Sequence, residues 1–273
     1  MKVSVIITTY KDLEALALTL DALKLQDYKD FEVVIAEDEE SENSTQFLKN
    51  YPLLDIKHVS HPDIGRTKTV IQNKALDASS GEYLIFLDGD VIPYSKFISS
   101  QVAIAKRGQV LAGRRVNLDE KTSVKLRSGE LKAPTIEKYY LLYALRFMSS
   151  KDARFEQGIY ISPSSWIYRL FLSKRKRHAS ILGCNFSCFK DDLAAINGFD
   201  ESYEPSTLGD DTDLTWRFKA SGCELVSSKN IANIFHLWHP RTRGKIPQET
   251  IERYEKNRKE NRYITKNGLI KQS

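Results

Sequence analysis

The sequence has little cysteine, no glycine- or proline-rich segment and no long apolar run. Its 273 residues include 3 Cys, 13 Gly and 8 Pro. Three cysteines without paired metal-ligand spacing exclude a disulfide-rich scaffold and favour a reducing compartment. The ordinary glycine and proline content excludes collagenous and low-complexity chains. The composition therefore predicts a folded globular protein with a cytoplasmic location.

Charge and hydropathy exclude two further classes of protein. No stretch approaches the roughly 18 apolar residues that cross a bilayer, and the apolar run from Val3 turns polar at Thr8, too short for a signal peptide. The net charge of +5 falls short of a nucleic-acid-binding signature. Basic residues gather at Lys174–Arg177, at Arg241–Lys245 and in the tail. We expect no nucleic-acid partner, and peripheral contact with the inner face of a membrane stays open beside a solvated basic loop.

Strand and helix patterns alternate along the first part of the chain. The expected strands are 3–9, 31–36, 56–59 and 83–87, and the expected helices are 13–23, 44–50 and 67–78, with Asp12 as the N-cap of the first helix. This alternation predicts an α/β fold with a mostly parallel central sheet flanked by helices. Ligands bind at the carboxyl ends of such strands. We therefore expect the polar clusters 8–10, 37–38 and 88–90 to converge on one rim.

Beyond residue 110 the patterns are less regular. The expected elements are a strand at 110–116, a helix at 135–147, a strand at 181–187, helices at 190–196 and 211–221, a strand near Leu225 and a basic helical tail. The segment between 117 and 180 carries an aromatic and basic stretch, 166–172, in its least regular part. Loops of this kind often carry specificity.

Two carboxylates follow the apolar run that ends at Leu87. Asp88 and Asp90 flank Gly89, and acids at i and i+2 beside a flexible glycine can share a hard divalent cation. The alternative is that both acids only form a turn or cap a helix.

A second acidic cluster spans Asp210 to Asp213. On a helix beginning here, Asp211 shares an inward face with Leu214 and Phe218, while Asp213 and Arg217 form an ordinary ion pair on another face. This pattern singles out Asp211 as the acid of a cleft. The alternative is that the acids only complement the helix N-terminus.

Two histidines, His236 and His239, precede Arg241, Arg243 and Lys245. An imidazole there can bind a metal, and the cations can bind phosphate oxygens. Residues three apart on an extended strand face opposite sides, so only one histidine is expected as a ligand, with His236 favoured. The alternative is a packed histidine without a ligand.

These motifs together resemble the inverting family 2 glycosyltransferases with the GT-A fold, and within them domains of the galactosyltransferase and chondroitin-polymerase type. The resemblance covers about residues 2–115 and 181–240. It is carried by residues 3–10, 32–38, 73–76, 81–90, 183–187, 197–201 and 210–214.

The resemblance implies a GT-A domain at 1–245, with a Rossmann-like sheet, and a basic helical tail at 246–273. Within it, 1–115 would bind the nucleotide sugar, 116–180 would face the acceptor or membrane, and 181–245 would complete the catalytic side. The implied roles are Thr8 and Tyr10 flanking the nucleotide, Asp38 with Glu37 receiving the base, Asp88 on the ribose, Asp90 and His236 or His239 on the metal, and Asp211 as general base.

The implied reaction transfers a hexose or N-acetylhexosamine from a UDP-sugar to a glycan or lipid-linked acceptor, with Mn²⁺ or Mg²⁺, in bacterial surface polysaccharide or lipopolysaccharide synthesis. Departures from the family pattern are Glu39 and Glu40 after Asp38, and Gln72 in place of an arginine, for which Arg66 could substitute. Arg241 or Arg243 could close over the diphosphate. Candidate acceptor-binding residues are Trp166, Tyr168, Asn185, Tyr203, Asp210 and Trp238.

Two alternatives belong to other classes. A sugar-phosphate nucleotidyltransferase should carry a glycine-rich phosphate loop after the first strand, which Thr8–Asp12 lacks. A non-catalytic nucleotide- or glycan-binding module would not need both Asp90 and Asp211. The oligomeric state is open.

Overall fold

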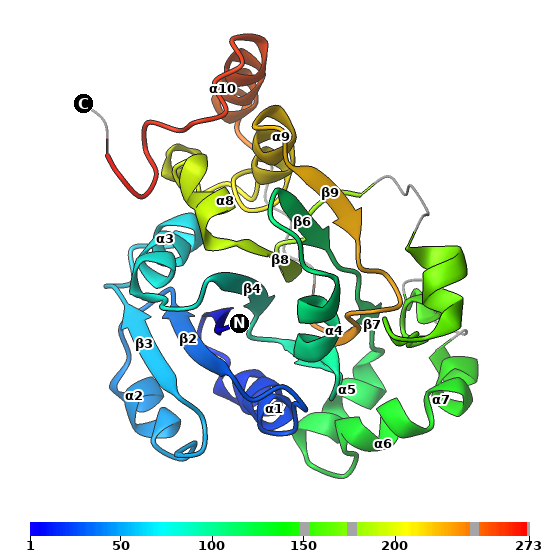
Figure 1. Ribbon diagram of the computed structural model, residues 1–273. Helices are drawn as coiled ribbons and strands as arrows, with labels where there is room; N and C mark the ends of the chain where they lie inside the picture. The colour runs from blue at the N-terminus through cyan, green and yellow to red at the C-terminus, as the bar shows by residue number, and fades with distance from the viewer. Residues whose placement is uncertain (148–152, 174–178, 241–245, 272–273) are drawn as a thin grey trace.

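A seven-stranded mixed β-sheet forms the centre of the protein (Figure 1). The computed structural model describes residues 1–147, 153–173, 179–240 and 246–271. The strand order is β3-β2-β1-β4-β8-β6-β9. The strands are β1 (Val3–Thr9), β2 (Phe31–Glu37), β3 (Ile56–Ser60), β4 (Tyr83–Asp88), β6 (Gln109–Ala112), β8 (Asn185–Phe189) and β9 (Glu224–Ser227).

Most neighbouring strands of this sheet are parallel. β1 runs parallel to β2 and β4, β2 to β3, and β6 to β9, whereas β8 is antiparallel to both β4 and β6. The register pairs Thr8 with Asp88 and Thr9 with Glu37. The sequence prediction of a mostly parallel sheet is confirmed, and the polar ends of three strands lie at one edge.

Helices cover both faces of the sheet because alternate strand residues point to opposite sides. On one face, Leu16 and Leu20 pack with Val5 and Ile85. On the other face, helical residues such as Ile71 pack with inward residues that include Phe86. The first layer contains α1 (Leu13–Lys24), α2 (Glu42–Leu48) and α4 (Phe97–Ile104), and the second α3 (Lys68–Ala78), α8 (Lys190–Ala195) and α9 (Thr212–Ala220).

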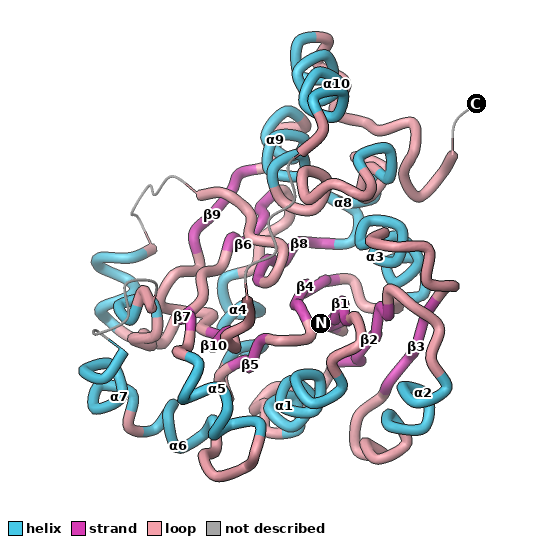
Figure 2. The backbone as a smooth tube through the Cα atoms, turned by 180° about the vertical axis from the view of Figure 1, so that it is seen from behind, coloured by secondary structure: helices cyan, strands magenta, loops and turns pink. Residues whose placement is uncertain are grey.

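A second, three-stranded sheet adjoins the first (Figure 2). Its order is β5-β10-β7, and it packs with further helices through buried residues such as Phe235 and Leu126. The elements are β5 (Val91–Pro93), β7 (Val116–Asn117), β10 (Ile234–His236), α5 (Glu120–Arg127), α6 (Ala133–Lys138) and α7 (Tyr140–Phe147). Asp88-Gly89-Asp90 leads directly from β4 to β5. It therefore lies where the two sheets meet.

Three expected elements are divided or displaced. The strand expected at 110–116 is broken at Gly113, where a Cβ would overlap the side-chain amide of Asn185. The helix expected at 135–147 is broken at Tyr139, whose backbone leaves the helical region. The strand expected from residue 181 begins only at Asn185. The chain can therefore pass from the large sheet to the small one at Gly113.

The tail packs against the second helical layer through polar contacts with the backbone. It includes α10 (Gln248–Lys259), and Asn197 donates to the carbonyls of Thr265 and Ile270, at 2.8 Å each. The buried Arg217 donates to the carbonyl of Tyr263 at 2.9 Å. Among the described helices, none combines the length and apolar character needed to cross a bilayer.

Candidate functional site

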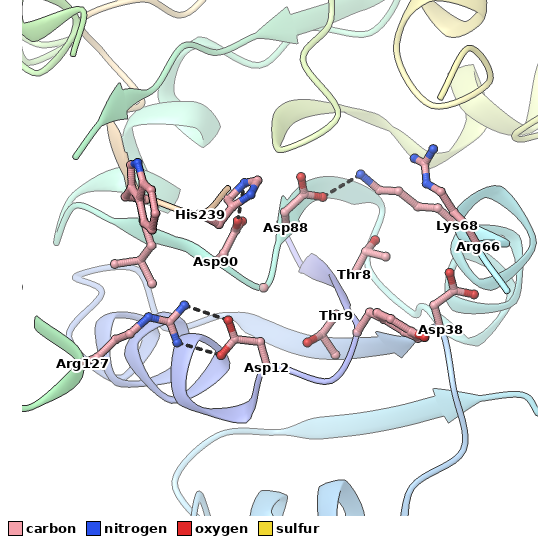
Figure 3. A pocket seen from close by; sticks show the side chains of 14 residues that line it. Thr8, Thr9, Asp12, Asp38, Arg66, Lys68, Asp88, Asp90, Arg127 and His239 are labelled. Carbon is pink, nitrogen blue, oxygen red and sulfur yellow. Dashed lines mark hydrogen bonds and ion pairs between the residues drawn. The ribbon is translucent and has the colours of Figure 1, made fainter. Parts of the chain in front are cut away.

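A cavity of about 520 Å³ opens at the carboxyl ends of β1 and β4 (Figure 3). Asp88 lies between the Asp90–His239 pair on one side and Lys68 and Arg66 on the other. The lining residues are Thr8, Thr9, Tyr10, Asp12, Asp38, Arg66, Lys68, Asp88, Gly89, Asp90, Arg127, Leu237, Trp238 and His239. The structure thus brings the predicted polar clusters to one cavity.

Lys68, at the start of α3, joins the two acidic clusters. Its ammonium lies 2.7 Å from Asp88 and 3.1 Å from Asp210, and Arg66 lies 3.3 Å from the same Asp210 carboxylate. Burial alone would raise the pKa of Asp88, but the charge and hydrogen bond of Lys68, together with other nearby groups such as Arg115, hold that pKa below its ordinary value. The segment that carries Asp211 is therefore fixed beside the end of β4.

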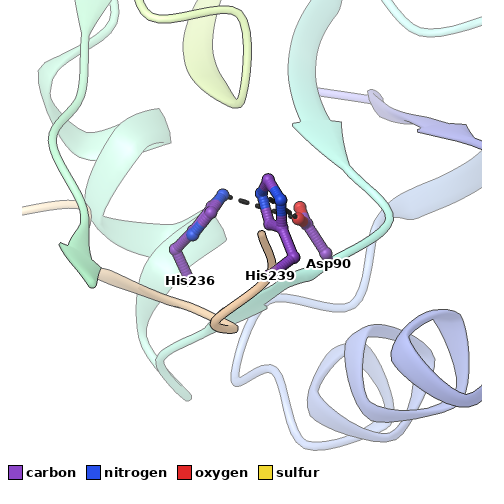
Figure 4. Close-up of side chains that lie close together, drawn as sticks. All are labelled: Asp90, His236 and His239. Carbon is purple, nitrogen blue, oxygen red and sulfur yellow. Dashed lines mark ion pairs between the residues drawn. The ribbon is translucent and has the colours of Figure 1, made fainter. Parts of the chain in front are cut away.

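Asp90 and His239 form the other side of the cavity, and His236 lies beside them in the adjoining cavity (Figure 4). The Nε2 atoms of His236 and His239 each lie 3.5 Å from the Asp90 carboxylate. The premise that the two histidines face opposite sides does not hold here, because β10 ends at His236 and the chain then turns, which brings His239 back to Asp90 (Figure 4). Thr19 of α1 supports the Asp-Gly-Asp turn. Its hydroxyl donates a hydrogen bond, at 2.7 Å, to the carbonyl of Val91, the residue directly after the turn.

The donor set of Asp90, His236 and His239 fits a divalent transition metal. The ligand atoms lie within 4.8 Å of one another, and Oδ1 of Asp90 is buried with no hydrogen-bond partner among the described residues. Burial, followed by the charge of Asp88, raises the pKa of Asp90 to about 6. Burial and then Arg115 lower the pKa of His236 to about 3, which keeps that imidazole neutral and able to coordinate.

The predicted nucleotide-binding residues differ in their exposure to the cavity. Thr8, Tyr10, Asp38 and Arg66 line it, and Asp38 accepts hydrogen bonds from the backbone and hydroxyl of Thr67. Glu37 lies beneath them. It is buried, 2.8 Å from Nε2 of His58 and in contact with the hydroxyl of Ser44. The structure therefore gives Glu37 a packing role and leaves Asp38, itself buried, as the acid that lines the cavity.

Asp211 is the residue before α9 and lies next to Asp210, outside the cavity lining. Its carboxylate accepts a hydrogen bond from Thr212 at 3.0 Å. Burial, followed by repulsion from Asp210, raises its pKa above the ordinary value. Asp213 and Arg217 do form an ion pair, at 3.4 Å, but the expectation of an ordinary pair was wrong, because both side chains are buried.

Several site residues were not predicted as such. Lys68 was read only as part of a helix, and Asp12 only as a helix cap. Asp12 does cap α1, but it also forms a two-point ion pair with Arg127 of α5, at 2.7 and 2.8 Å. The helix-cap pattern gave the local role of Asp12, whereas its pairing with a residue far along the chain left no signal in the sequence.

The candidate acceptor residues are scattered. Trp238 lines the main cavity and an adjoining one of about 420 Å³. Tyr168 lines a different cavity beside β9, and Trp166, two residues earlier on the same helical segment, is exposed. Tyr203 and Asn185 are buried.

The buried pair does not reach the cavity, which corrects their expected role. The hydroxyl of Tyr203 accepts from Asn257 of the tail at 3.0 Å. The amide of Asn185 donates to the carbonyls of Arg114 and Ala232. Both residues serve packing. Arg241 and Arg243, like Lys174–Arg177, lie outside the described residues.

Known proteins match most of the chain. Residues 4–175 match glycosyl transferase family 2, and residues 170–240 match the N-terminal domain of galactosyltransferase. The chain is 32% identical over 103 residues to a chondroitin synthase of Escherichia coli, which is 37% of this chain and 15% of that protein. It is 28% identical over 109 residues to a GalNAc(5)-diNAcBac-PP-undecaprenol beta-1,3-glucosyltransferase of Campylobacter jejuni subsp. jejuni, 39% of this chain and 35% of that protein. The chain thus matches well under half of the length of either relative.

Solved structures share the fold at low identity. S. aureus TarS superposes with a TM-score of 0.61 and 17% identity, covering 94% of this chain and 39% of TarS. TarS 1-349 in complex with UDP-GlcNAc superposes with a TM-score of 0.58 and 16% identity, covering 90% of this chain and 60% of the TarS chain. The mannosyltransferase PcManGT from Pyrobaculum calidifontis, in complex with GDP-Man and Mn²⁺, gives 0.55 and 16%, covering 89% and 58%. The predicted GT-A fold is confirmed, and since the family model spans more than half of the sequence, this chain belongs to glycosyl transferase family 2.

Proposed function

We propose that this chain is a metal-dependent inverting glycosyltransferase that moves a hexose or N-acetylhexosamine from a UDP-sugar to a glycan hydroxyl. Three buried polar atoms in the cavity lining carry the proposal: Oγ1 of Thr8, Nη1 of Arg66 and Oδ1 of Asp90 have no hydrogen-bond partner within the described chain. Buried polar groups are normally paired. A nucleotide diphosphate would supply oxygen acceptors for Thr8 and Arg66, and the divalent cation that accompanies it would supply the partner of Asp90.

The nucleotide would bind between Thr8, Tyr10 and Asp38, with Asp88 at the ribose. Arg66 then donates a hydrogen bond to the nucleotide sugar. The negative charge of Asp210 stays balanced by Lys68 and Arg66. A cavity of about 520 Å³ is within the range of small-molecule sites. The contact of Lys68, from the nucleotide-binding half that we expect, with Asp210, from the expected catalytic half, supports this assignment.

Asp90, His236 and His239 would hold the divalent cation. Such an ion, when bound, neutralises the negative charge that develops on the departing diphosphate. Neutral His236 and unpartnered Oδ1 of Asp90 are prepared for this role.

Asp211 would act as the general base. Its raised pKa makes it a stronger proton acceptor than an ordinary aspartate, and it accepts the proton of the acceptor hydroxyl as the oxygen attacks the anomeric carbon. Attack opposite to the leaving diphosphate inverts the configuration at that carbon. Trp238, at the mouth of two cavities, offers a ring face for a sugar acceptor.

The relatives bear on donor and pathway. TarS has been solved with UDP and UDP-GlcNAc, and the relatives in E. coli and C. jejuni are named for a polysaccharide and for an undecaprenol-linked acceptor. We therefore place the reaction in bacterial surface polysaccharide or lipopolysaccharide synthesis, on the cytoplasmic side. The three unpaired cysteines suit a reducing compartment.

The test combines donor binding with turnover. We expect Asp211→Asn to retain UDP binding in calorimetry with Mn²⁺, and to lose at least about 10²-fold in kcat, as for removal of a general base. Thr212→Ser, at the neighbouring residue, retains the hydroxyl that binds Asp211 and serves as the matched control. An Asp211→Asn variant with unchanged kcat contradicts the assignment of the base.

A further inference from the structure

Two neighbouring segments expose an unusual number of large apolar side chains. On α7, Leu141, Leu142 and Leu145 are 70%, 68% and 69% exposed. On the segment around the helical turn Tyr168–Leu172, Trp166 and Phe171 are 65% and 63% exposed. We call the seven exposed residues of the two segments the apolar rim: Leu141, Leu142, Leu145, Trp166, Ile167, Leu170 and Phe171.

The exposure follows from how each helix is anchored. Tyr140 and Ala144 point into the core beside Phe235, so the opposite face of α7 must point outward. Tyr168 and Leu172 likewise face a cavity beside β9. The light-green helical turn lies directly above α7 at the same edge of the molecule in Figure 1, and Figure 2 shows the same edge from behind.

The charged residues within the two segments have one sign. Lys138, before α7, and Arg169, within the second segment, are exposed cations. The sequence has no Asp or Glu from residue 138 to 151 or from 157 to 190. Two exposed apolar segments that carry cations and no acids complement the anionic headgroups and the acyl boundary of a lipid membrane.

We propose that the apolar rim docks the protein on an anionic membrane surface. Leu141, Leu142 and Leu145 enter the acyl boundary, and Trp166 lies at the headgroup level, where tryptophan is enriched. Lys138 and Arg169 bind lipid phosphates. This orientation goes beyond the proposed transfer reaction, because it holds for any acceptor.

A second copy of the chain fits this surface less well. A two-fold interface brings the same patch of each copy together. The cations at the margin would then face cations, with no acid of either segment to pair with them. A membrane provides the opposite charge that a second copy lacks.

Vesicle flotation tests the docking without substrate. We expect the wild-type chain to float with vesicles that contain phosphatidylglycerol, and less with pure phosphatidylcholine or in high salt. Leu142→Gln/Leu145→Gln should reduce the bound fraction by about tenfold or more, since two leucines that the proposal buries in the membrane are lost. Leu53→Gln/Ile270→Gln, at residues 86% and 71% exposed on other parts of the surface, is the matched control.

Three outcomes overturn the proposal: no flotation with either vesicle, equal loss in the control variant, or a wild-type dimer in sedimentation velocity that Leu142→Gln/Leu145→Gln converts to a monomer. Circular dichroism confirms that both variants are folded. Because flotation needs neither nucleotide nor acceptor, its failure leaves the proposed transfer reaction untouched.

Discussion

At the scale of single residues, Lys68 holds the site together through one ammonium group between Asp88 and Asp210. Lys68→Met leaves two largely buried acids short of a counter-charge. We expect the free energy of unfolding to fall by about 3 kcal/mol, the lower end for a broken buried pair, since Asp210 keeps Arg66. Urea denaturation measures the change. Lys68→Arg retains the charge and should lose much less; equal losses would show that charge is not the cause.

The raised pKa of Asp211 predicts how activity depends on pH. A general base works only when deprotonated, so kcat should fall as the pH drops through this pKa, at a higher pH than for an ordinary aspartate. Asp210→Asn removes the second cause of the shift and should move the acidic limb of the kcat profile to lower pH. An unmoved limb in that variant would argue that Asp211 is not the titrating group.

The ligands proposed for the cation predict its identity. Two imidazoles and one carboxylate favour Mn²⁺ over Mg²⁺, which prefers oxygen ligands. Calorimetry should give tighter UDP binding with Mn²⁺ than with Mg²⁺, and His239→Ala should reduce that difference. Lys138→Ala, at an exposed cation away from the cavity, is the control. Equal affinity with both ions in the wild type would exclude this ligand set.

At the scale of elements, Arg217 fastens α9 to the tail and to the loop after α8. Its guanidinium donates to the carbonyls of Tyr263 and Gly198, at 2.9 and 2.8 Å, and contacts that of Ile196. It also faces the buried Asp213. Arg217→Met should therefore lower the free energy of unfolding by about 3–5 kcal/mol. The segment that carries Asp211 depends on this anchor.

The same pair predicts a pH dependence of stability. Burial raises the pKa of Asp213 from 3.8 to about 7, and Arg217 opposes the rise. Between these values the folded chain binds the additional proton, so stability falls as the pH rises through this window. Without Arg217 the pKa of Asp213 rises further. The free energy of unfolding that Arg217→Met loses should therefore be greater above this pH window than within it. Urea midpoints on both sides, with Arg217→Lys as control, measure this; a loss independent of pH would contradict it.

At the scale of the whole molecule, ligand binding should stabilise the fold. A ligand at 100 times its Kd adds about 2.7 kcal/mol to the free energy of unfolding. For a domain of this size, each kcal/mol raises Tm by roughly 2–4 °C. We expect UDP with Mn²⁺ to raise Tm by about 5–10 °C in the wild type, and Asp90→Ala to lose most of this shift. ADP with Mn²⁺ tests the base; a shift equal to that of UDP would remove the preference for uracil.

The part of the fold set by local patterns could be predicted from the sequence. Runs of β-branched residues predicted the first four strands, and patterns such as the cap at Asp12 predicted the helices between them. Both kinds of pattern depend only on residues that are near in sequence. The breaks at Gly113 and Tyr139 were missed. At Gly113, the side chain of Asn185, far along the chain, fills the space that a side chain would need, and this packing has no local sequence pattern.

The same limit applies to the site. The strand ends placed Thr8, Asp38, Asp88 and Asp90 on one rim, since parallel strands align their carboxyl ends. Pairings across the chain, such as Arg127 with Asp12, depend on how α5 packs on α1 and have no local pattern. The burial of Tyr203 depends in the same way on the docked tail.

The close approach of Gly113 and Asn185 has a consequence for how such proteins can diversify. The backbone N–H of Gly113 donates to the carbonyl of Asn185 at 2.9 Å, so the long excursion between them leaves and re-enters the sheet at one point. A segment of another length could be exchanged there as a cassette. The exchange would alter the segments of the apolar rim, the smaller cavity and Arg127 in the main cavity, while Lys68, Asp88 and Asp90 kept their places.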